Sequence, residues 1–218
     1  IQTKLLQKVA SYPNIRIFSH YFVTDLLVRS KAGTSTCVGI RALDLNKNIL
    51  TEIKSSISLL ATGGSGKLFR NTTNPPVSTA DGVAMAFNAG AEIADMNFVQ
   101  FHPTALYEEK AGPLFLISEA VRGYGAYLVN KAGKRFLFEH DHRGELATRD
   151  IISAAILKEL ANTGEECVFL DCRHLDHKGF ERHFPTIVEH CREKNLNLKI
   201  DLIPVIPAAH YQCGGIKV

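Results

Sequence analysis

The chain has 218 residues, of which 45% are hydrophobic and 22% charged, a composition typical of a folded, soluble globular protein and not of a disordered, collagen-like or coiled-coil one. The formal net charge is only +3 and basic residues alternate with acidic ones, so nothing predicts a nucleic-acid-binding surface. No apolar stretch approaches the roughly 20 residues of a membrane span. Five dispersed cysteines without CxxC spacing favour a reduced, cytoplasmic setting over disulfides or a zinc ribbon.

The first part of the sequence predicts a short helix followed by a β-meander. Leu5, Leu6 and Val9 form one apolar helix face, and the helix must end before Pro13 because proline disfavours the α conformation in the preceding residue. Four segments rich in β-branched or aromatic residues and separated by polar turns predict the strands: 15–18, 22–28, 37–45 and 49–54. The apolar run 56–61 predicts a buried strand that ends on glycines beside a ligand.

Longer helices are predicted further along the chain. Asp81 is the expected N-cap of a helix, and after residue 103 the sequence changes to shorter elements with charged turns, so we place a domain crossing there. A strong helix is predicted from Thr148 to a stop at Gly164. Three further elements are predicted after it: a strand at 167–171, a helix whose first turn contains Pro185, and an extended segment at 203–209.

Three motifs that would indicate other chemistry are incomplete. The run GGSGK at 63–67 lacks the first glycine and the final Ser or Thr of a phosphate-binding loop. No G-x-G-x-x-G dinucleotide fingerprint is complete in the sequence. The nine histidines include pairs such as His140 and His142, but their spacing beside charged turns is typical of solvated surface and no HExxH pattern accompanies them. We therefore predict no metal site.

Two helix starts have both a structural and a functional interpretation. Ser118 and Glu119 precede a short helix and are explained by capping and by the helix dipole alone. Arg149 beside Asp150 could form a surface ion pair of little energetic weight. An arginine in the first turn of a helix nevertheless opposes the macrodipole and needs a compensating anion. A substrate carboxylate would be one.

Six segments of the chain occur in the order found in a known enzyme family. These are ATGG (61–64), ADG (80–82), NFVQFHPT (97–104), SEAVRGYGAYL (118–128), RGELATRD (143–150) and PAAHYQCGG (207–215). Through them the chain resembles the succinate dehydrogenase and fumarate reductase flavoprotein family, and PVIPAAHYQCGG is most similar to the members that oxidise L-aspartate. The resemblance spans essentially the whole chain but only an internal portion of the family's length. We therefore expect a fragment that, isolated, holds FAD weakly.

The resemblance implies binding of FAD and of a small dicarboxylate. It places FAD near Val23, Thr62, Gly63, Gly64, Asp81 and Gly82. It places the substrate near His102, Ser118, Arg149 and His210, with Glu119 beside Arg149 as a second catalytic residue. Arg149 is expected to act first as carboxylate clamp and electrostatic stabiliser and only second in proton transfer, because arginine stays protonated in proteins and is a poor base.

The expected fold class is α/β plus α+β: a partial FAD-binding, Rossmann-like domain at 1–103 and 208–218 with an inserted α+β capping domain at 104–207. The implied activity is oxidation of L-aspartate to iminoaspartate by hydride transfer to flavin, with oxygen or fumarate as acceptor, in quinolinate and NAD biosynthesis. A handover of product to quinolinate synthase follows from that role. The alternatives are succinate or fumarate oxidoreduction and a non-catalytic binding module that keeps the fold. No nucleic-acid or membrane partner is expected.

Overall fold

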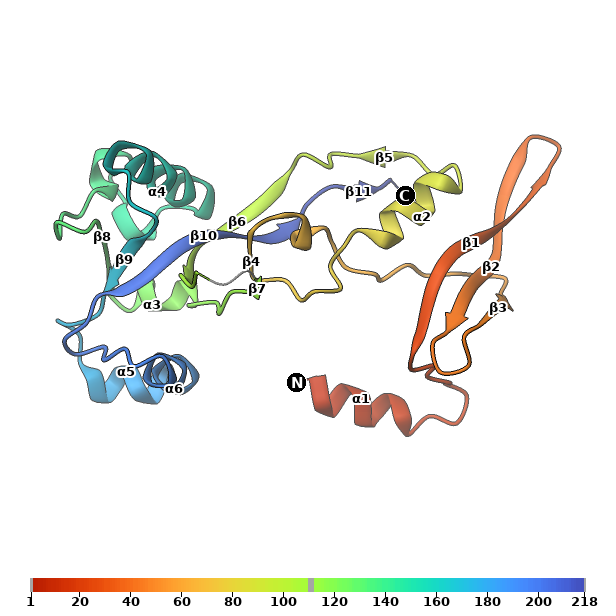
Figure 1. Ribbon diagram of the computed structural model, residues 1–218, viewed down its shortest axis with the longest axis horizontal. Helices are drawn as coiled ribbons and strands as arrows, with labels where there is room; N and C mark the ends of the chain where they lie inside the picture. The colour runs from red at the N-terminus through yellow and green to blue at the C-terminus, as the bar shows by residue number, and fades with distance from the viewer. Residues whose placement is uncertain (1, 110–111, 218) are drawn as a thin grey trace. The chain divides into compact units, whose positions relative to one another are not determined.

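The computed structural model describes residues 2–109 and 112–217, and the chain divides into two compact units (Figure 1). The first unit contains the residues up to 61, residues 82–92 and the residues from 216 onward, and the second contains residues 62–81 and 93–215. Within the part of the chain that the structure describes, every helix falls short of the length and apolar content that a membrane crossing requires.

The first unit is built on a three-stranded antiparallel meander in the order β1-β2-β3. Its elements are α1 (Gln2–Ala10), β1 (Tyr21–Lys31), β2 (Thr34–Asp44), β3 (Ile49–Lys54) and nearly all of α2 (Asp81–Asn88). β1 and β2 are joined by Ala32 and Gly33, both of which have positive φ, 49° and 81°, as a type I′ hairpin turn requires. The last three strands of the predicted meander are thus confirmed.

Two segments predicted as strands are not strands in the structure. Residues 15–18 and 56–61 have no regular strand structure. Ile57 and Leu59 are 86% and 89% exposed, so the prediction of a buried strand at 56–61 is wrong. An apolar pattern supplies the side chains of a strand but not the neighbouring strands that complete its hydrogen bonds. Among the described residues, no strand pairs with either segment.

The second unit contains a six-stranded sheet in which the long strand β10 is central. The order is β7-β4-β10-β9-β8, and β6 also pairs with β10. Two short strands, β5 and β11, form a separate two-stranded sheet. The strands are β4 (Asn71–Thr72), β5 (Ile93–Ala94), β6 (Val99–Leu106), β7 (Gly112–Pro113), β8 (Tyr127–Val129), β9 (Val168–Asp171), β10 (Ile203–Gln212) and the first residue of β11 (Gly215–Ile216), whose second residue is counted in the first unit. The helices are η1 (Gly66–Leu68), α3 (Glu119–Gly123), η2 (Leu137–Glu139), η3 (Gly144–Leu146), α4 (Arg149–Thr163), α5 (His177–His183) and α6 (Pro185–Glu193).

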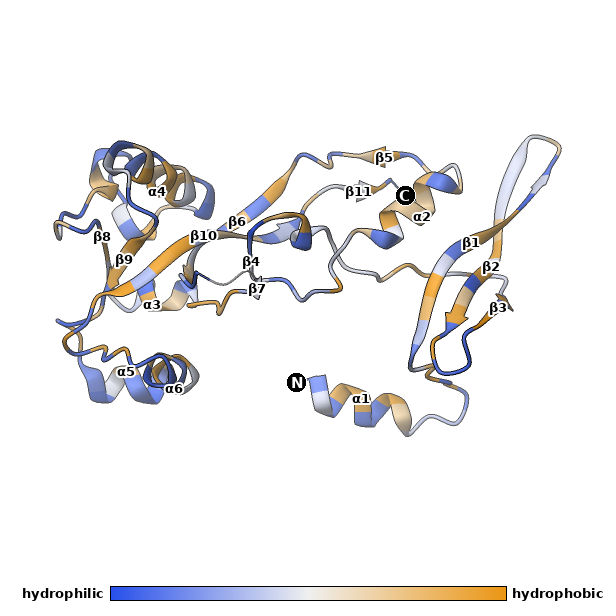
Figure 2. Ribbon diagram, in the orientation of Figure 1, coloured by the Kyte–Doolittle hydropathy of each residue, from blue (hydrophilic) through white to orange (hydrophobic). Residues whose placement is uncertain are grey.

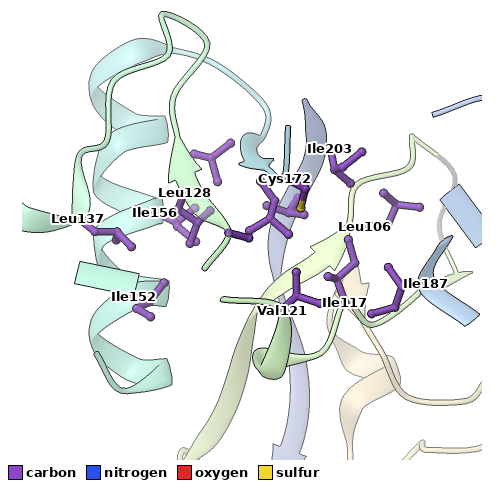
Figure 3. Close-up of a cluster of buried hydrophobic side chains, with 14 of the residues drawn as sticks. Leu106, Ile117, Val121, Leu128, Leu137, Ile152, Ile156, Cys172, Ile187 and Ile203 are labelled. Carbon is purple, nitrogen blue, oxygen red and sulfur yellow. The ribbon is translucent and has the colours of Figure 1, made fainter. Parts of the chain in front are cut away.

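The larger hydrophobic cluster of the second unit packs α3, α4, α5 and α6 against the six-stranded sheet. Figure 3 shows Val121 of α3, Leu128 of β8 and Ile156 of α4 among the side chains of this cluster, all of them fully buried. α4 ends at Gly164, whose φ of 72° lies in the left-handed region that glycine adopts at helix C-termini. The predicted helix and its stop are confirmed, and the core holds the start of α4 in a defined place.

Prolines interrupt the pairing of β6 with β10 at one point. The register shifts between Ile206 and Ala208, and Pro207 lies in this gap opposite Pro103 and Thr104. The pairing is interrupted there because proline has no N–H to give to a ladder. A second irregularity follows between Ala209 and Tyr211. Figure 2 shows β10 hydrophobic along most of its length and polar toward β11. The predicted domain boundaries at 103 and 208 fall inside these two strands, and that division stays a prediction.

Candidate active site

Two adjacent strands bring the predicted substrate histidines together. His102 of β6 pairs with Ala208 of β10. His210 is the extra residue of the irregularity between Ala209 and Tyr211, and such a bulge reorients the side chain at the extra position. The two imidazole rings lie edge to face with their centroids 5.4 Å apart. The interrupted strand pairing therefore builds a two-histidine cluster.

The surroundings of His102 favour its neutral form at neutral pH. His102 is 1% exposed, and burial, followed by the positive charges of Arg149 and Arg122, lowers its pKa from 6.5 to about 3. Its Nδ1 accepts a hydrogen bond from the Thr104 backbone N–H at 3.3 Å, so the single proton of the neutral ring is on Nε2. His102 can therefore donate one hydrogen bond to a ligand without adding charge.

His210 is held by the segment that follows β4. The Thr73 hydroxyl oxygen lies 2.7 Å from His210 Nδ1, and the Asn74 side-chain amide donates to the His210 carbonyl at 2.8 Å. Burial, and then the charge of Arg149, lower the pKa of His210. Both histidines thus favour the neutral form, and the positive charge of the cluster comes from arginine.

Arg149 is the first residue of α4 and is held on two sides. Its Nε donates to Glu119 Oε2 at 2.8 Å and its Nη1 donates to Gln100 Oε1 at 2.8 Å. The hydrogen bond from Arg149 lowers the pKa of Glu119 and so favours its ionised form. The Glu119 carboxylate is the compensating anion that an arginine at a helix start requires. Among the described residues, Nη2 donates to no protein group. One edge of the guanidinium is therefore open to a carboxylate.

Ser118 lies one residue before α3 and caps it. Its hydroxyl accepts a hydrogen bond from the Ala120 N–H at 3.3 Å, and the residue is exposed. The capping interpretation made from the sequence is therefore confirmed. The hydroxyl hydrogen is left for another acceptor, so capping does not prevent Ser118 from contacting a substrate.

Three residues of the cluster were missed by reasoning from the sequence. Gln100 precedes His102 by two positions on β6, a spacing that places both side chains on one face of a strand. This spacing could have identified Gln100 as a site residue from the sequence. No local pattern marks Thr73. Arg122 lies one turn after Glu119 on α3 and is 2% exposed, and burial lowers its pKa. Two guanidinium groups against one carboxylate leave a net positive charge, which suits an anionic ligand.

The loop Thr62-Gly63-Gly64, predicted to contact the cofactor, presents free backbone donors. Thr62 and Gly63 are exposed, and within residues 2–109 and 112–217 their N–H groups have no protein acceptor. Gly63 has a φ of 75°, and a Cβ on Gly64 would lie 2.8 Å from the Gln212 side chain. Glycine is thus required at both positions, and the loop fits a ligand bound by the main chain.

The other predicted cofactor positions lie in different parts of the chain. Asp81 is exposed and begins α2, so it is the first helical residue rather than the expected N-cap, and the preceding Ala80 donates its N–H to the Gly64 carbonyl at 3.1 Å. Val23, half-buried beside an irregularity of β1, and Gly82, buried in α2, belong to the first unit. Their contacts with a cofactor stay predictions.

Comparison with known proteins identifies the family of this chain. A family model described as FAD binding domain matches residues 1–218. The chain belongs to this family. Among curated relatives of this FAD-binding chain, L-aspartate oxidase 1 of Ralstonia nicotianae is 45% identical over 218 residues, covering 99% of this chain and 41% of the relative. L-aspartate oxidase of Vibrio cholerae is 40% identical over 220 residues, covering 100% of this chain and 41% of the relative.

Solved structures agree with this assignment to the FAD-binding family. The structure of a quinol-fumarate reductase with menaquinol molecules has a TM-score of 0.86 at 33% identity and covers 98% of this chain and 39% of that chain. The predicted mixed α/β fold, the flavoprotein resemblance and FAD as cofactor are confirmed. This FAD-binding chain spans about 41% of the length of the curated relatives named above, and the roles of its individual residues stay predictions.

Proposed function

We propose that the protein containing this chain oxidises L-aspartate to iminoaspartate with FAD. The observation that carries the proposal is the Arg149 guanidinium, oriented by Glu119 and Gln100 with one edge open, beside the neutral pair His102 and His210. The names of the curated relatives support the choice of substrate. L-Aspartate carries one net negative charge at neutral pH, and Arg149, Arg122 and Glu119 together carry one net positive charge, so the substrate and the site are complementary.

In this proposal the residues of the chain bind and orient the substrate. Arg149 Nη2 binds one carboxylate, and the Nε2–H of His102 donates a hydrogen bond to a carboxylate oxygen while the imidazole ring stays neutral. The Ser118 hydroxyl supplies a further donor. FAD, when bound, supplies the hydride acceptor, so the share of the protein is to hold the substrate Cα–H in a reactive orientation. Arg149 acts first as clamp and electrostatic stabiliser and second in proton transfer.

The loop after the unpaired segment 56–61 is suited to hold the cofactor. The free N–H groups of Thr62 and Gly63 can donate to polar atoms of FAD, and the absence of side chains at Gly63 and Gly64 lets such a ligand approach the backbone. Asp81 follows a residue that is hydrogen-bonded to this loop. For Val23 and Gly82, which belong to the first unit, contact with FAD stays a prediction.

Succinate or fumarate oxidoreduction is the second candidate function. It is supported by the structural similarity to a quinol-fumarate reductase, with a TM-score of 0.86. We rank it second because the identity to that structure is 33%, whereas the identity to the L-aspartate oxidase of Ralstonia nicotianae is 45%. A non-catalytic module that merely keeps the fold is disfavoured by the retained, hydrogen-bonded Arg149 and by the histidine pair.

Anaerobic reduction of FAD in the full-length protein tests the proposal. L-Aspartate should bleach the visible absorbance of oxidised flavin within one turnover, and succinate should do so much more slowly. Arg149→Ala should lower kcat/KM for L-aspartate by about a hundredfold or more, as expected for the loss of a charge-assisted clamp. Arg143→Ala, which removes a surface arginine paired with Asp141, is the matched control and should leave turnover unchanged.

Two results would refute this proposal. Rapid reduction by succinate with none by L-aspartate would favour the second candidate function. Turnover of Arg149→Ala within a few-fold of wild type would remove Arg149 from the site.

The proposal has three further parts. The protein is located in the cytoplasm, which the free thiols of the described cysteines support. Fumarate or oxygen accepts the electrons, and iminoaspartate is handed over to quinolinate synthase.

A further inference from the structure

A buried carboxylate lies just before the residue proposed to clamp the substrate. Glu145, in η3, is 6% exposed. Arg135 donates to both of its oxygens, from Nε at 3.1 Å and from Nη2 at 2.8 Å, and the Leu128 N–H of β8 donates to Oε1 at 3.2 Å. The Arg135 guanidinium lies 3.7 Å from the centroid of the Tyr127 ring. The Glu145 side chain is therefore tied to β8 both directly and through Arg135.

The main chain of Glu145 is tied to a different element. Arg122 Nη1 donates to the Glu145 carbonyl at 2.7 Å, and the other two guanidinium nitrogens of Arg122 are buried without a partner among the described residues. Arg122 belongs to α3, which also carries Glu119, the partner of Arg149. α3 is thus joined to the segment 145–149 twice, once at the carbonyl of Glu145 and once at the guanidinium of Arg149.

The two supports of Glu145 are anchored in the core. Val121 of α3 and Leu128 of β8 are both 0% exposed and belong to the same cluster (Figure 3). Gly144 makes the turn that brings Glu145 inward, since its φ is 54° and an added Cβ would lie 2.6 Å from the Phe138 ring. The start of α4 is therefore connected through Glu145 to two rigid elements.

We propose that Glu145 is a positioning residue that sets the orientation of the Arg149 guanidinium. The inference rests on the proposed function of Arg149 as carboxylate clamp. A buried carboxylate is costly to desolvate and is weak evidence for stability even when paired, so stability alone does not account for it. Its bonds instead restrain the backbone that leads into Arg149, and a displacement of about 1 Å at a reacting site can cost about a hundredfold in rate.

A double-mutant cycle in the full-length, FAD-loaded protein separates this role from a merely structural one. Glu145→Gln keeps the size of the side chain and an acceptor for Leu128 but removes the ion pair with Arg135. It is combined with Arg149→Lys, because an ammonium group has no planar fork for Glu145 to orient. Glu139→Gln, which removes a surface carboxylate paired with Lys134, is the matched control. Rates are normalised to the FAD-bound enzyme.

The expected result is strong non-additivity. Glu145→Gln should lower kcat/KM for L-aspartate about tenfold when residue 149 is Arg, mainly through KM, and less than about twofold when it is Lys. Equal losses in both backgrounds, or a loss confined to the amount of folded enzyme with KM unchanged, would overturn the proposal. If Glu145→Gln is not recovered folded, Arg135→Gln is judged by the same criterion, because it loosens Glu145 from the exposed side.

The same experiment distinguishes this inference from the proposed function. If wild type is reduced by succinate and not by L-aspartate, the proposed substrate is wrong and the cycle is run with succinate. If neither reduces it, the affinity for succinate, read from the change in the flavin spectrum, replaces kcat/KM. Non-additivity in whichever readout responds supports the role of Glu145. Additivity, or absence of any dicarboxylate binding by wild type, overturns it.

Discussion

Replacing His102 by glutamine should make the protein less sensitive to mild acid. Burial and the nearby arginines lower the pKa of His102 from 6.5 to about 3, so below about pH 6.5 the unfolded chain binds a proton that the folded protein excludes. Stability is therefore lost as the pH falls from about 6.5 toward 3. Between about pH 7.5 and pH 5 this single group should cost wild type about 2 kcal/mol of unfolding free energy.

The assay is urea unfolding of wild type and of His102→Gln in the full-length protein at both pH values. The variant loses a hydrogen bond and is expected to be less stable at neutral pH, but its further loss on acidification should be smaller than that of wild type by about 2 kcal/mol. His142→Gln, whose side chain is 91% exposed in wild type, serves as control. Equal acid sensitivity of wild type and His102→Gln, within about 0.5 kcal/mol, would show that the folded protein does not hold His102 neutral.

Two further predictions concern packing and thiol chemistry. Gly144→Ala should lower the unfolding free energy by about 2–3 kcal/mol, because alanine is strained at this positive φ and its Cβ meets the Phe138 ring. The control Gly133→Ala is strained in the same way but has nothing within 4 Å of the added Cβ, so it should cost only about 1 kcal/mol. Both changes are measured by urea unfolding. Burial raises the pKa of Cys172 to about 12 and of Cys191 to about 11, so iodoacetamide at mildly alkaline pH should label the exposed Cys213 first. Comparable labelling of Cys172 in the folded protein, detected by peptide mass spectrometry, would contradict its burial.

Local sequence patterns predicted the elements whose cause is local. Gly164 stops α4 because a left-handed residue closes a helix end, and Ala32-Gly33 closes the first hairpin because the turn needs two positive φ angles. The apolar run 56–61 was predicted as a buried strand by the same kind of reasoning, and this prediction was wrong. Burial and strand pairing depend on neighbours that a local pattern does not contain.

The candidate site shows the same division between chemistry and placement. The family resemblance implied that His102, His210 and Arg149 lie at the substrate, and their residue types suit that role because a carboxylate ligand needs cationic or hydrogen-bonding partners. The helix dipole predicted that Arg149 needs an anion, but only the tertiary structure shows that Glu119 already supplies it inside the protein. Gln100, Thr73 and Arg122 were missed because their contacts join positions far apart in the chain.

The sequence by itself determined the chemistry available to this protein: the neutral or cationic side chains, the glycine loop at 62–64 and the helix that begins at Arg149. The tertiary structure decided how those groups are used. The interrupted pairing of β6 with β10 brings the centroids of the two histidine rings to 5.4 Å from each other, and Glu119 and Gln100 hold the Arg149 guanidinium. The physical reason is that charge, hydrogen-bonding capacity and backbone preference belong to single residues, whereas burial, pKa and orientation depend on residues that only folding brings together.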